Sequence, residues 1–234
     1  MNRIVVVTGA TSGFGLATAK KFLENNDTVI IASRNAEKVN DAVNKFGFAD
    51  GFAIDVTDYD KWLELKEFVL KKYGRIDVLV NNAGSGLKIA DADEQTKNDI
   101  DNIIKLNLNS VLYGCSVFAD TFKKQKDGVI INISSVCATH AWPGWSVYAS
   151  AKAGVLNYTK GLYLELQPYG VRASCVIPAS ASTGFQRNSG IGETADSLSV
   201  DDIANAVLFA ANQSKRAVVQ DVTVWGTSQV CNPL

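Results

Sequence analysis

Short, continuous apolar runs alternate with longer helical stretches along this chain. The runs Arg3–Thr8 and Thr28–Ala32 are rich in β-branched residues, which is typical of parallel strands buried on both faces. Between them, from Leu16 to Asn25, apolar residues recur at the spacing of one helix face. These three segments predict a strand–helix–strand unit at the start of the chain.

The same alternation continues toward the C-terminus. Ser199 and Asp202 form a capping-box signal for the start of the last helix. Seven strands alternating with six helices predict an α/β fold of the Rossmann type, a doubly wound parallel sheet with right-handed crossovers and helices on both faces. Beyond the first unit, strands are expected at Gly51–Asp55, Ile76–Asn81, Val129–Ser134, Arg172–Ile177 and Val218–Val224, and helices at Ala36–Phe46, Asp58–Tyr73, Asp99–Phe122, Trp145–Gln167 and from Ser199.

The pattern predicts a single domain over residues 1–234. No proline occurs before Pro143, no linker rich in glycine and serine is present, and no repeat of 20 to 50 residues is found. The segment 179–198 is rich in small and polar residues, so we expect it to form a loop over the site.

The composition of the chain argues against several classes of partner, namely nucleic acids, metal ions and membranes. The chain has 23 Lys plus Arg against 24 Asp plus Glu, and this balance argues against nucleic acid as a partner. The 4 cysteines form no CxxC pair and there is 1 histidine, which argues against a metal site and for reduced thiols in the cytoplasm. No apolar run approaches the ~18 residues of a membrane helix, so no membrane partner and no signal peptide are expected.

A glycine-rich turn, Thr8–Gly15, lies between the first strand and the first helix and reads TGATSGFG. Glycines here allow a tight turn and let the backbone approach a pyrophosphate, whose charge the helix N-terminus favours. The turn therefore predicts dinucleotide binding, with a merely structural turn as the alternative. The expected cofactor contacts in it are Gly9, Thr11, Ser12, Gly13, Phe14 and Gly15.

The end of the second strand indicates which dinucleotide binds. An NAD site usually has a carboxylate there for the ribose 2′-hydroxyl, whereas this chain has Ser33 and Arg34. A guanidinium can bind a 2′-phosphate through two hydrogen bonds, and an uncharged serine does not repel that phosphate. NADP(H) is therefore the predicted cofactor, and a solvated surface arginine is the alternative reading of Arg34.

Four further motifs follow at strand ends and in the later helices. They are Asp55-Val56, Asn81-Asn82-Ala83-Gly84, Asn107, and Ser135 with Tyr148-Ala149-Ser150-Ala151-Lys152. In order and spacing they resemble the classical short-chain dehydrogenases/reductases, from Val5 to about Val224. The resemblance implies an oxidoreductase that transfers a hydride between a nicotinamide cofactor and a small carbonyl compound or alcohol, and a homodimer or homotetramer.

The resemblance also implies a proton-transfer site made of Ser135, Tyr148, Lys152 and Asn107. Residues four apart share a helix face, so Lys152 can lie beside Tyr148 and lower the pKa of its phenol from the ordinary ~10. Such a phenol could act as general acid or base near neutral pH. Ser135 follows the fifth strand and can hydrogen-bond the substrate oxygen, while Asn107 positions a water or, alternatively, kinks its helix.

By the same resemblance, Lys152 also holds the nicotinamide ribose, and Asp55 contacts the adenine or merely caps a strand end. After the sixth strand the family usually has Pro-Gly, whereas this chain has Pro178 and Ala179, so the geometry near the nicotinamide is expected to differ. The further cofactor contacts that the resemblance implies are Asp55, Val56, Asn82, Ala83, Gly84, Tyr148, Lys152, Pro178 and Thr183.

Several residues near the expected substrate mouth admit two interpretations. His140 is expected to have a loop or interface role, because Ser135 is not in the GxSxG elbow of a serine hydrolase. Cys137 is interpreted as a small hydrophobe, and Trp142 and Trp145 as pocket walls or plain packing. Arg187 could pair with a substrate carboxylate or remain solvated.

Two other function classes compete with the oxidoreductase. A non-catalytic dinucleotide-sensing protein could keep the fold, but it would not need Ser135, Tyr148 and Lys152 together. An epimerase or lyase of similar fold would retain its cofactor through turnover. The two long helical stretches Asp99–Phe122 and Trp145–Gln167 are where we expect subunits to associate.

Overall fold

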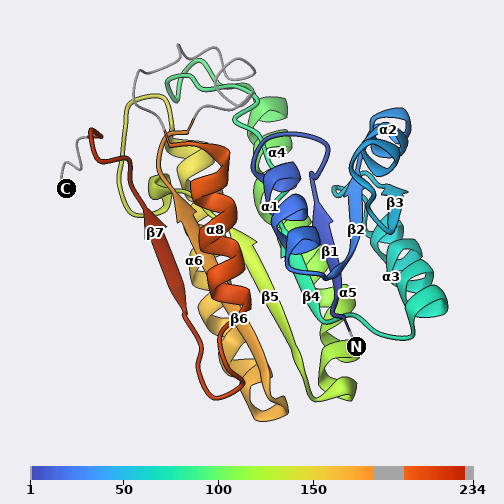
Figure 1. The fold of residues 1–234 in the computed structure, drawn as a ribbon. Helices are drawn as coiled ribbons and strands as arrows, with labels where there is room; N and C mark the ends of the chain where they lie inside the picture. Colours follow the sequence, from blue (N-terminus) through green and yellow to red (C-terminus); the bar gives the residue numbers. More distant parts are fainter. Residues whose placement is uncertain (1, 182–197, 230–234) are drawn as a thin grey trace.

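A computed structural model describes residues 2–181 and 198–229, and a parallel sheet of seven strands lies at its centre (Figure 1). The strand order is β3-β2-β1-β4-β5-β6-β7, and the order reverses between β1 and β4. This arrangement confirms the predicted Rossmann-type, doubly wound α/β fold. The strands are β1 (Ile4–Thr8), β2 (Thr28–Ser33), β3 (Asp50–Ala53), β4 (Val78–Asn81), β5 (Gly128–Ile133), β6 (Val171–Pro178) and β7 (Asp221–Val224).

Helices cover both faces of the sheet. The helices α1 and α8 pack side by side on one face, and α5 and α6 lie on the other, with α3 against α5 (Figure 1). The helical segments are α1 (Gly13–Glu24), α2 (Ala36–Phe46), α3 (Tyr59–Tyr73), α4 (Lys97–Ile104), the π-helix η1 (Lys105–Asn109), α5 (Ser110–Gln125), the 3-10 helix η2 (Val136–Ala138), α6 (Ser146–Leu166), the 3-10 helix η3 (Gln167–Tyr169) and α8 (Val200–Ala211).

One crossover departs from the predicted right-handed connections. The helices α1 and α8 share a face of the sheet, but β2 lies on one side of β1 whereas β7 lies on the opposite side of β6 (Figure 1). The β6–α8–β7 connection therefore has the opposite hand from β1–α1–β2. The apolar side of α8, with Ile203, Ala204 and Val207 fully buried, is covered on this face, where it meets α1.

The central strands form the core. Every residue of β1, β4 and β5 is buried, as expected for apolar runs that are covered on both faces. The edge strands β3 and β7 are only partly buried, and β7 is shorter than the predicted Val218–Val224 because its pairing with β6 begins at Asp221 opposite Cys175.

The predicted helix Asp99–Phe122 is not continuous. The Asn107 side-chain amide donates to the Ile103 carbonyl (3.0 Å), which is the acceptor that an α-helix would offer to the Asn107 backbone N–H. The helix widens there into η1, and α5 continues after it. At the other end of the chain, the Ser199–Asp202 capping box is confirmed at the start of α8.

The predicted loop 179–198 lies largely outside the described residues. Its two ends meet, because Ala181 and Leu198 form a parallel bridge and the Leu198 N–H donates to the Ser180 carbonyl (3.1 Å). Across the ranges 2–181 and 198–229, no helix has the length and apolar character needed to cross a membrane.

Candidate functional site

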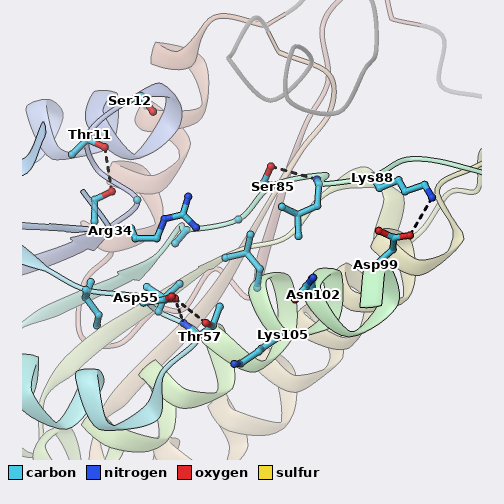
Figure 2. Close-up of a pocket in the computed structure, with 18 residues that line it drawn as sticks. Thr11, Ser12, Arg34, Asp55, Thr57, Ser85, Lys88, Asp99, Asn102 and Lys105 are labelled. Carbon is cyan, nitrogen blue, oxygen red and sulfur yellow. Dashed lines mark hydrogen bonds and ion pairs between the residues drawn. The ribbon is translucent and has the colours of Figure 1, made fainter. Parts of the chain in front are cut away.

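The predicted cofactor residues gather at the carboxyl edge of the sheet, where β1 and β4 diverge, around a cavity of about 900 Å³ (Figure 2). Open α/β sheets bind ligands at this point. The predicted residues that line it are Gly9, Thr11, Ser12, Ser33, Arg34, Asp55, Val56, Ala83 and Gly84. The cavity is also lined by residues that the sequence did not single out, namely Ile54, Thr57, Ser85, Leu87, Lys88, Asp99, Asn102, Lys105 and Leu106.

The glycine-rich turn has no room for side chains. Gly9 and Gly13 have positive φ angles of 66° and 53°, and a Cβ on Gly15 would lie 2.4 Å from the Gly9 carbonyl oxygen. Ser12 is the N-cap of α1, and its side chain makes no capping hydrogen bond. The first-turn N–H groups of α1 are therefore left to an anion at this helix end.

Asn82 and Ala83 are held against this turn by Thr8, the last residue of β1. The Thr8 hydroxyl accepts hydrogen bonds from the N–H groups of Asn82 (3.0 Å) and Ala83 (3.2 Å). The Asn82 side-chain amide donates to the Thr8 carbonyl (2.9 Å). These bonds fix the backbone after β4 beside the turn after β1, and they assign Asn82 a role in positioning both.

A pair of hydroxyls and a cation lie at the end of β2. The Thr11 and Ser33 hydroxyls are 3.2 Å apart and hydrogen-bonded, and Arg34 is exposed beside them on the cavity wall (Figure 2). Two hydroxyls and a guanidinium form a donor set suited to a phosphate. Arg34 is both exposed and on the cavity wall, so its contact with a cofactor stays a prediction beside the alternative of a solvated surface arginine.

Asp55 lies at the end of the strand next to this group. Its carboxylate accepts hydrogen bonds from the Thr57 N–H (2.9 Å) and hydroxyl (2.8 Å), so the strand-end cap considered for Asp55 is present. Partial burial alone would raise the pKa of Asp55, but the Thr57 hydrogen bonds, with Arg34 and Lys105 nearby, bring it below its ordinary value. Asp55 is therefore a carboxylate that lines the cavity.

Ser135, Tyr148 and Lys152 come together beyond the end of β5. Ser135 caps η2, and its hydroxyl accepts the Cys137 N–H (3.2 Å) and lies near enough to Tyr148 to affect the pKa of its phenol. Tyr148 and Lys152 are both buried on the same side of α6. The Lys152 Nζ donates to the Ile133 carbonyl (2.9 Å) and lies 5.7 Å from the centre of the Tyr148 ring.

Burial governs the protonation of this group. It raises the pKa of Tyr148, an effect to which Cys137 adds and which Ser135 only partly offsets. Burial also lowers the pKa of Lys152 to about 8. The net pKa of Tyr148 is therefore raised and not lowered as expected, because loss of water around the phenolate dominates, and the favourable contribution of Lys152 stays a prediction.

The Asn107 side chain makes three hydrogen bonds. Its amide donates to the carbonyls of Ser85 (2.8 Å) and Ile103 (3.0 Å), and its Oδ1 accepts the Ser85 N–H (3.1 Å). The kink considered for Asn107 is therefore present. A Cβ on Gly84 would lie 2.9 Å from the Asn107 Oδ1 and 3.4 Å from the Lys152 Nζ, so Gly84 is the element that separates these two side chains.

The aromatic residues after η2 divide into two groups. Trp145 packs edge-on against Tyr148, with ring centres 5.6 Å apart, and so lies at the site. His140 stacks on Trp142 (6.0 Å) and meets the edge of Trp225 (5.4 Å), which supports the predicted loop role. Cys137 is buried with Ile103 and Tyr148, as expected for a small hydrophobe.

Two predicted cofactor contacts, Pro178 and Thr183, and the question of a metal site remain. Pro178 ends β6 at the same edge of the sheet, and the Ala179 N–H donates to the Val224 carbonyl (2.9 Å). Thr183 and Arg187 lie outside the described residues. Within the described ranges, no group of three or more His, Cys, Asp or Glu side chains could hold a metal ion.

Comparison with known proteins points to one family. The short chain dehydrogenase family model matches residues 3–195. A serine 3-dehydrogenase of Agrobacterium fabrum is 33% identical over 239 residues, covering 98% of this chain and 96% of the relative. A 3-oxoacyl-(acyl-carrier-protein) reductase of Thermotoga maritima is 32% identical, covering 94% of each. The closed form of a serine dehydrogenase complexed with NADP+ superposes with a TM-score of 0.93 at 25% identity, covering 99% of this chain and 98% of the other.

Proposed function

The chain belongs to the short chain dehydrogenase family, and from this we propose that it is an NADP(H)-dependent oxidoreductase that transfers a hydride between the nicotinamide and a small carbonyl compound or alcohol. The observation that carries the proposal is that Ser135, Tyr148 and the buried Lys152 lie together beyond β5. The Ser135 hydroxyl accepts the N–H of Cys137, which packs with Tyr148, and the Lys152 Nζ lies 5.7 Å from the centre of the Tyr148 ring. A hydroxyl pair of this kind at the carboxyl edge of the sheet can bind and protonate a carbonyl oxygen.

The cavity supports the choice of cofactor. The tight glycine turn places the first-turn N–H groups of α1, which the Ser12 side chain does not cap, where a pyrophosphate would bind. Thr11, Ser33 and Arg34 would hold a 2′-phosphate, and Asp55 would face the adenine. NADP+ is also the cofactor in the structural relative with the TM-score of 0.93.

When bound, NADPH supplies the hydride for the carbonyl carbon. The Ser135 hydroxyl already accepts the Cys137 N–H, so its own proton is left to donate to the substrate oxygen. Tyr148 then gives its phenolic proton to that oxygen, and the product is an alcohol. Burial raises the pKa of Tyr148 and so keeps this proton in place near neutral pH until the oxygen takes it.

Lys152 completes the proposed site. Its ammonium, 5.7 Å from the Tyr148 ring centre, stabilises the phenolate that remains after proton transfer. We also assign it a hydrogen bond to the nicotinamide ribose. Asn107 keeps Ser85 and Ile103 in place behind Gly84, which makes it a positioning residue in this proposal.

The test is Tyr148→Phe, with Tyr158→Phe on the same helix as the matched control. Consumption of NADPH is measured over a panel of aldehydes and ketones, and NADPH binding by fluorescence. We expect Tyr148→Phe to lose at least about 10²-fold in kcat while still binding NADPH, because the ring remains and the proton is absent. Tyr158→Phe should retain activity.

Other outcomes identify the rival classes. A wild type that binds NADPH and reduces no member of the panel would be a sensing protein. Dinucleotide that stays bound through purification and turnover would favour an epimerase or lyase. Full activity in Tyr148→Phe would remove the proposed proton donor.

A further inference from the structure

Tyr148 is surrounded by apolar side chains from α4, from η2 and from two connecting segments. Cys137 and Ile103 are its buried neighbours, and Ile89 and Trp145 pack against this group. Cys137 and Tyr148 are 8% and 7% exposed, so both side chains are almost completely shielded from water. The hydroxyl to which we assign proton transfer thus lies in an environment of low polarity.

The loops that carry this apolar wall are tied together. The Ala90 N–H donates to the Gly144 carbonyl (3.1 Å), which joins the segment after β4 to the segment after η2. Gly144 has a φ of 79°, and a Cβ there would lie 3.4 Å from the Ile89 side chain. The contact joins the segments that carry Ile89 and Trp145, and both of these side chains pack against the group that contains Tyr148.

No charged partner for a substrate carboxylate lies on these segments. The described residues that follow β5, β6 and β7, at 134–145, 178–181 and 225–229, include no Lys, Arg, Asp or Glu. On the loop after β4, the Lys88 Nζ is bonded to the Glu94 carbonyl (2.6 Å) and to Asp99 (3.1 Å). Lys152, on α6, directs its Nζ to the Ile133 carbonyl (2.9 Å). A carboxylate beside Tyr148 would therefore lose its water without gaining a Lys or Arg partner from the described segments that follow the strands.

Among the apolar residues around Tyr148, Cys137 is the one that is hydrogen-bonded directly to Ser135. Its backbone N–H donates to the Ser135 hydroxyl (3.2 Å), and its side chain packs with Tyr148. The substituent of a carbonyl carbon whose oxygen contacts Ser135 and Tyr148 would therefore meet Cys137. An apolar substituent would bind more tightly through that contact, whereas a charged substituent would bind more weakly because it loses its water.

We propose, resting on the function proposed above, that the substrates are neutral aldehydes or ketones with an apolar substituent, and that Cys137 selects them together with Ile89 and Trp145. The wall sets both the polarity and the size of the group beside the reacting carbonyl. Cys137 is thus a specificity-determining residue, and Ser135 and Tyr148 remain the proton-transfer pair.

The first experiment compares ethyl 3-oxobutanoate with 3-oxobutanoate, a neutral and a charged form of one carbon skeleton, using wild type and NADPH. We expect kcat/KM for the ester to exceed that for the acid by at least about tenfold. L-Serine, the substrate in the name of the Agrobacterium relative, is tested in the oxidative direction with NADP+ and is expected to give no turnover. Reduction of 3-oxobutanoate as efficient as that of the ester, abolished by Tyr148→Phe, would overturn the substrate class and leave the proposed function standing.

The second experiment changes the size of the wall. In Cys137→Leu, kcat/KM for 1-phenyl-1,2-propanedione should fall about tenfold more than kcat/KM for 2,3-butanedione, since the larger side chain takes the space of the phenyl group. Cys137→Ser should keep the ratio of the two diones near the wild-type value, because the side chain remains small. Cys115→Ser, on α5 and buried against Asn81 of β4 and Asn132 of β5, is the control for loss of a thiol and should keep both values. An equal fall for both diones in Cys137→Leu would make Cys137 a structural residue and overturn its selective role.

Discussion

The Lys152 ammonium lies 5.7 Å from the centre of the Tyr148 ring, and its Nζ is bonded to the Ile133 carbonyl. Lys152 is 3% exposed, and burial lowers its pKa from 10.5 to about 8. Near neutral pH the folded protein therefore keeps a cation out of water at this position. Such a charge is unfavourable for stability and is placed where a proton-transfer site can use it.

This burial predicts how stability depends on pH. The folded pKa of Lys152 lies below the unfolded value, so between about pH 8 and about 10.5 the unfolded state binds more protons and stability rises with pH. Replacing the lysine in Lys152→Met removes this contribution. From about pH 7 to about 9.5, wild type should gain about 2 kcal/mol in free energy of unfolding relative to the variant, by the linkage relation.

The measurement is urea unfolding of wild type and Lys152→Met at the two pH values. The same comparison with Lys160→Met, an exposed lysine of the same helix, should show no such relative change. A difference between wild type and Lys152→Met that is independent of pH would contradict the buried charge. Activity should be lost in Lys152→Met at both pH values.

Gly84→Ala is predicted to damage the site through one methyl group. The added Cβ would lie 2.9 Å from the Asn107 Oδ1, and Asn107 cannot yield easily because Ser85 and Ile103 hold its amide. The methyl group also approaches the Lys152 Nζ at 3.4 Å. We expect a stability loss of about 1–3 kcal/mol and a fall of at least about tenfold in kcat, measured with NADPH and a ketone that wild type reduces.

Gly161→Ala is the matched control for this substitution. Gly161 lies within α6 and is exposed, and a methyl group added there would meet no atom within 4 Å outside its own helix backbone. Alanine there should raise stability by about 0.5–1 kcal/mol through helix propensity and leave kcat unchanged. If Gly84→Ala behaved like Gly161→Ala, the separation of Asn107 from Lys152 would have no role in catalysis.

Most of the fold can be predicted from the sequence because the central strands are short apolar runs buried on both faces. A run such as Ile4–Thr8 has no other way to bury every side chain. The hand of the β6–α8–β7 connection could not be predicted, since it depends on the packing of α8 against α1. The π-helix at Lys105–Asn109 could not either, because it goes with side-chain bonds of Asn107 to Ile103 and to Ser85 in a distant segment, which the sequence pattern does not reveal.

The candidate site divides in the same way. Tyr148 and Lys152 can be paired from their spacing, and Ser135 from its place after a strand, since these are local signals. The direction of the pKa change at Tyr148 depends on burial, which only the folded chain supplies. Thr8 is not expected from the sequence to have a role beyond the turn that it begins, and Ser85 belongs to no motif, so their roles become visible only in the hydrogen bonds to Asn82 and Asn107.

Cofactor preference is the last prediction, and it rests on two adjacent residues at the end of β2. The Ser33 hydroxyl is bonded to Thr11 at 3.2 Å, and Arg34 lines the same cavity. A 2′-phosphate can accept hydrogen bonds from both hydroxyls and from the guanidinium, whereas the 2′-hydroxyl of NADH leaves the guanidinium without an anion. Wild type should therefore prefer NADPH over NADH.

Two substitutions distinguish the attraction of the 2′-phosphate by Arg34 from its repulsion by an added carboxylate. Arg34→Ala should lower kcat/KM for NADPH by about 10- to 100-fold, the loss of one or two units of about 1.4 kcal/mol, with little effect on NADH. Ser33→Asp should do more, because its carboxylate repels the 2′-phosphate and also accepts a hydrogen bond from the ribose hydroxyl of NADH. Its effect should include a rise in kcat/KM for NADH.

The measurement is kcat/KM with both cofactors for wild type, Arg34→Ala, Ser33→Asp and the control Lys38→Ala. Lys38 is an exposed cation early in α2 and is not among the residues around the cavity, so its loss tests for a general effect of charge. An equal fall in kcat/KM for NADPH in Lys38→Ala and Arg34→Ala would mean that the cofactor responds to the net charge of the protein and not to a contact with Arg34. If wild type used NADH as well as NADPH, or if Ser33→Asp left the ratio unchanged, Ser33 and Arg34 would not form the 2′-phosphate site.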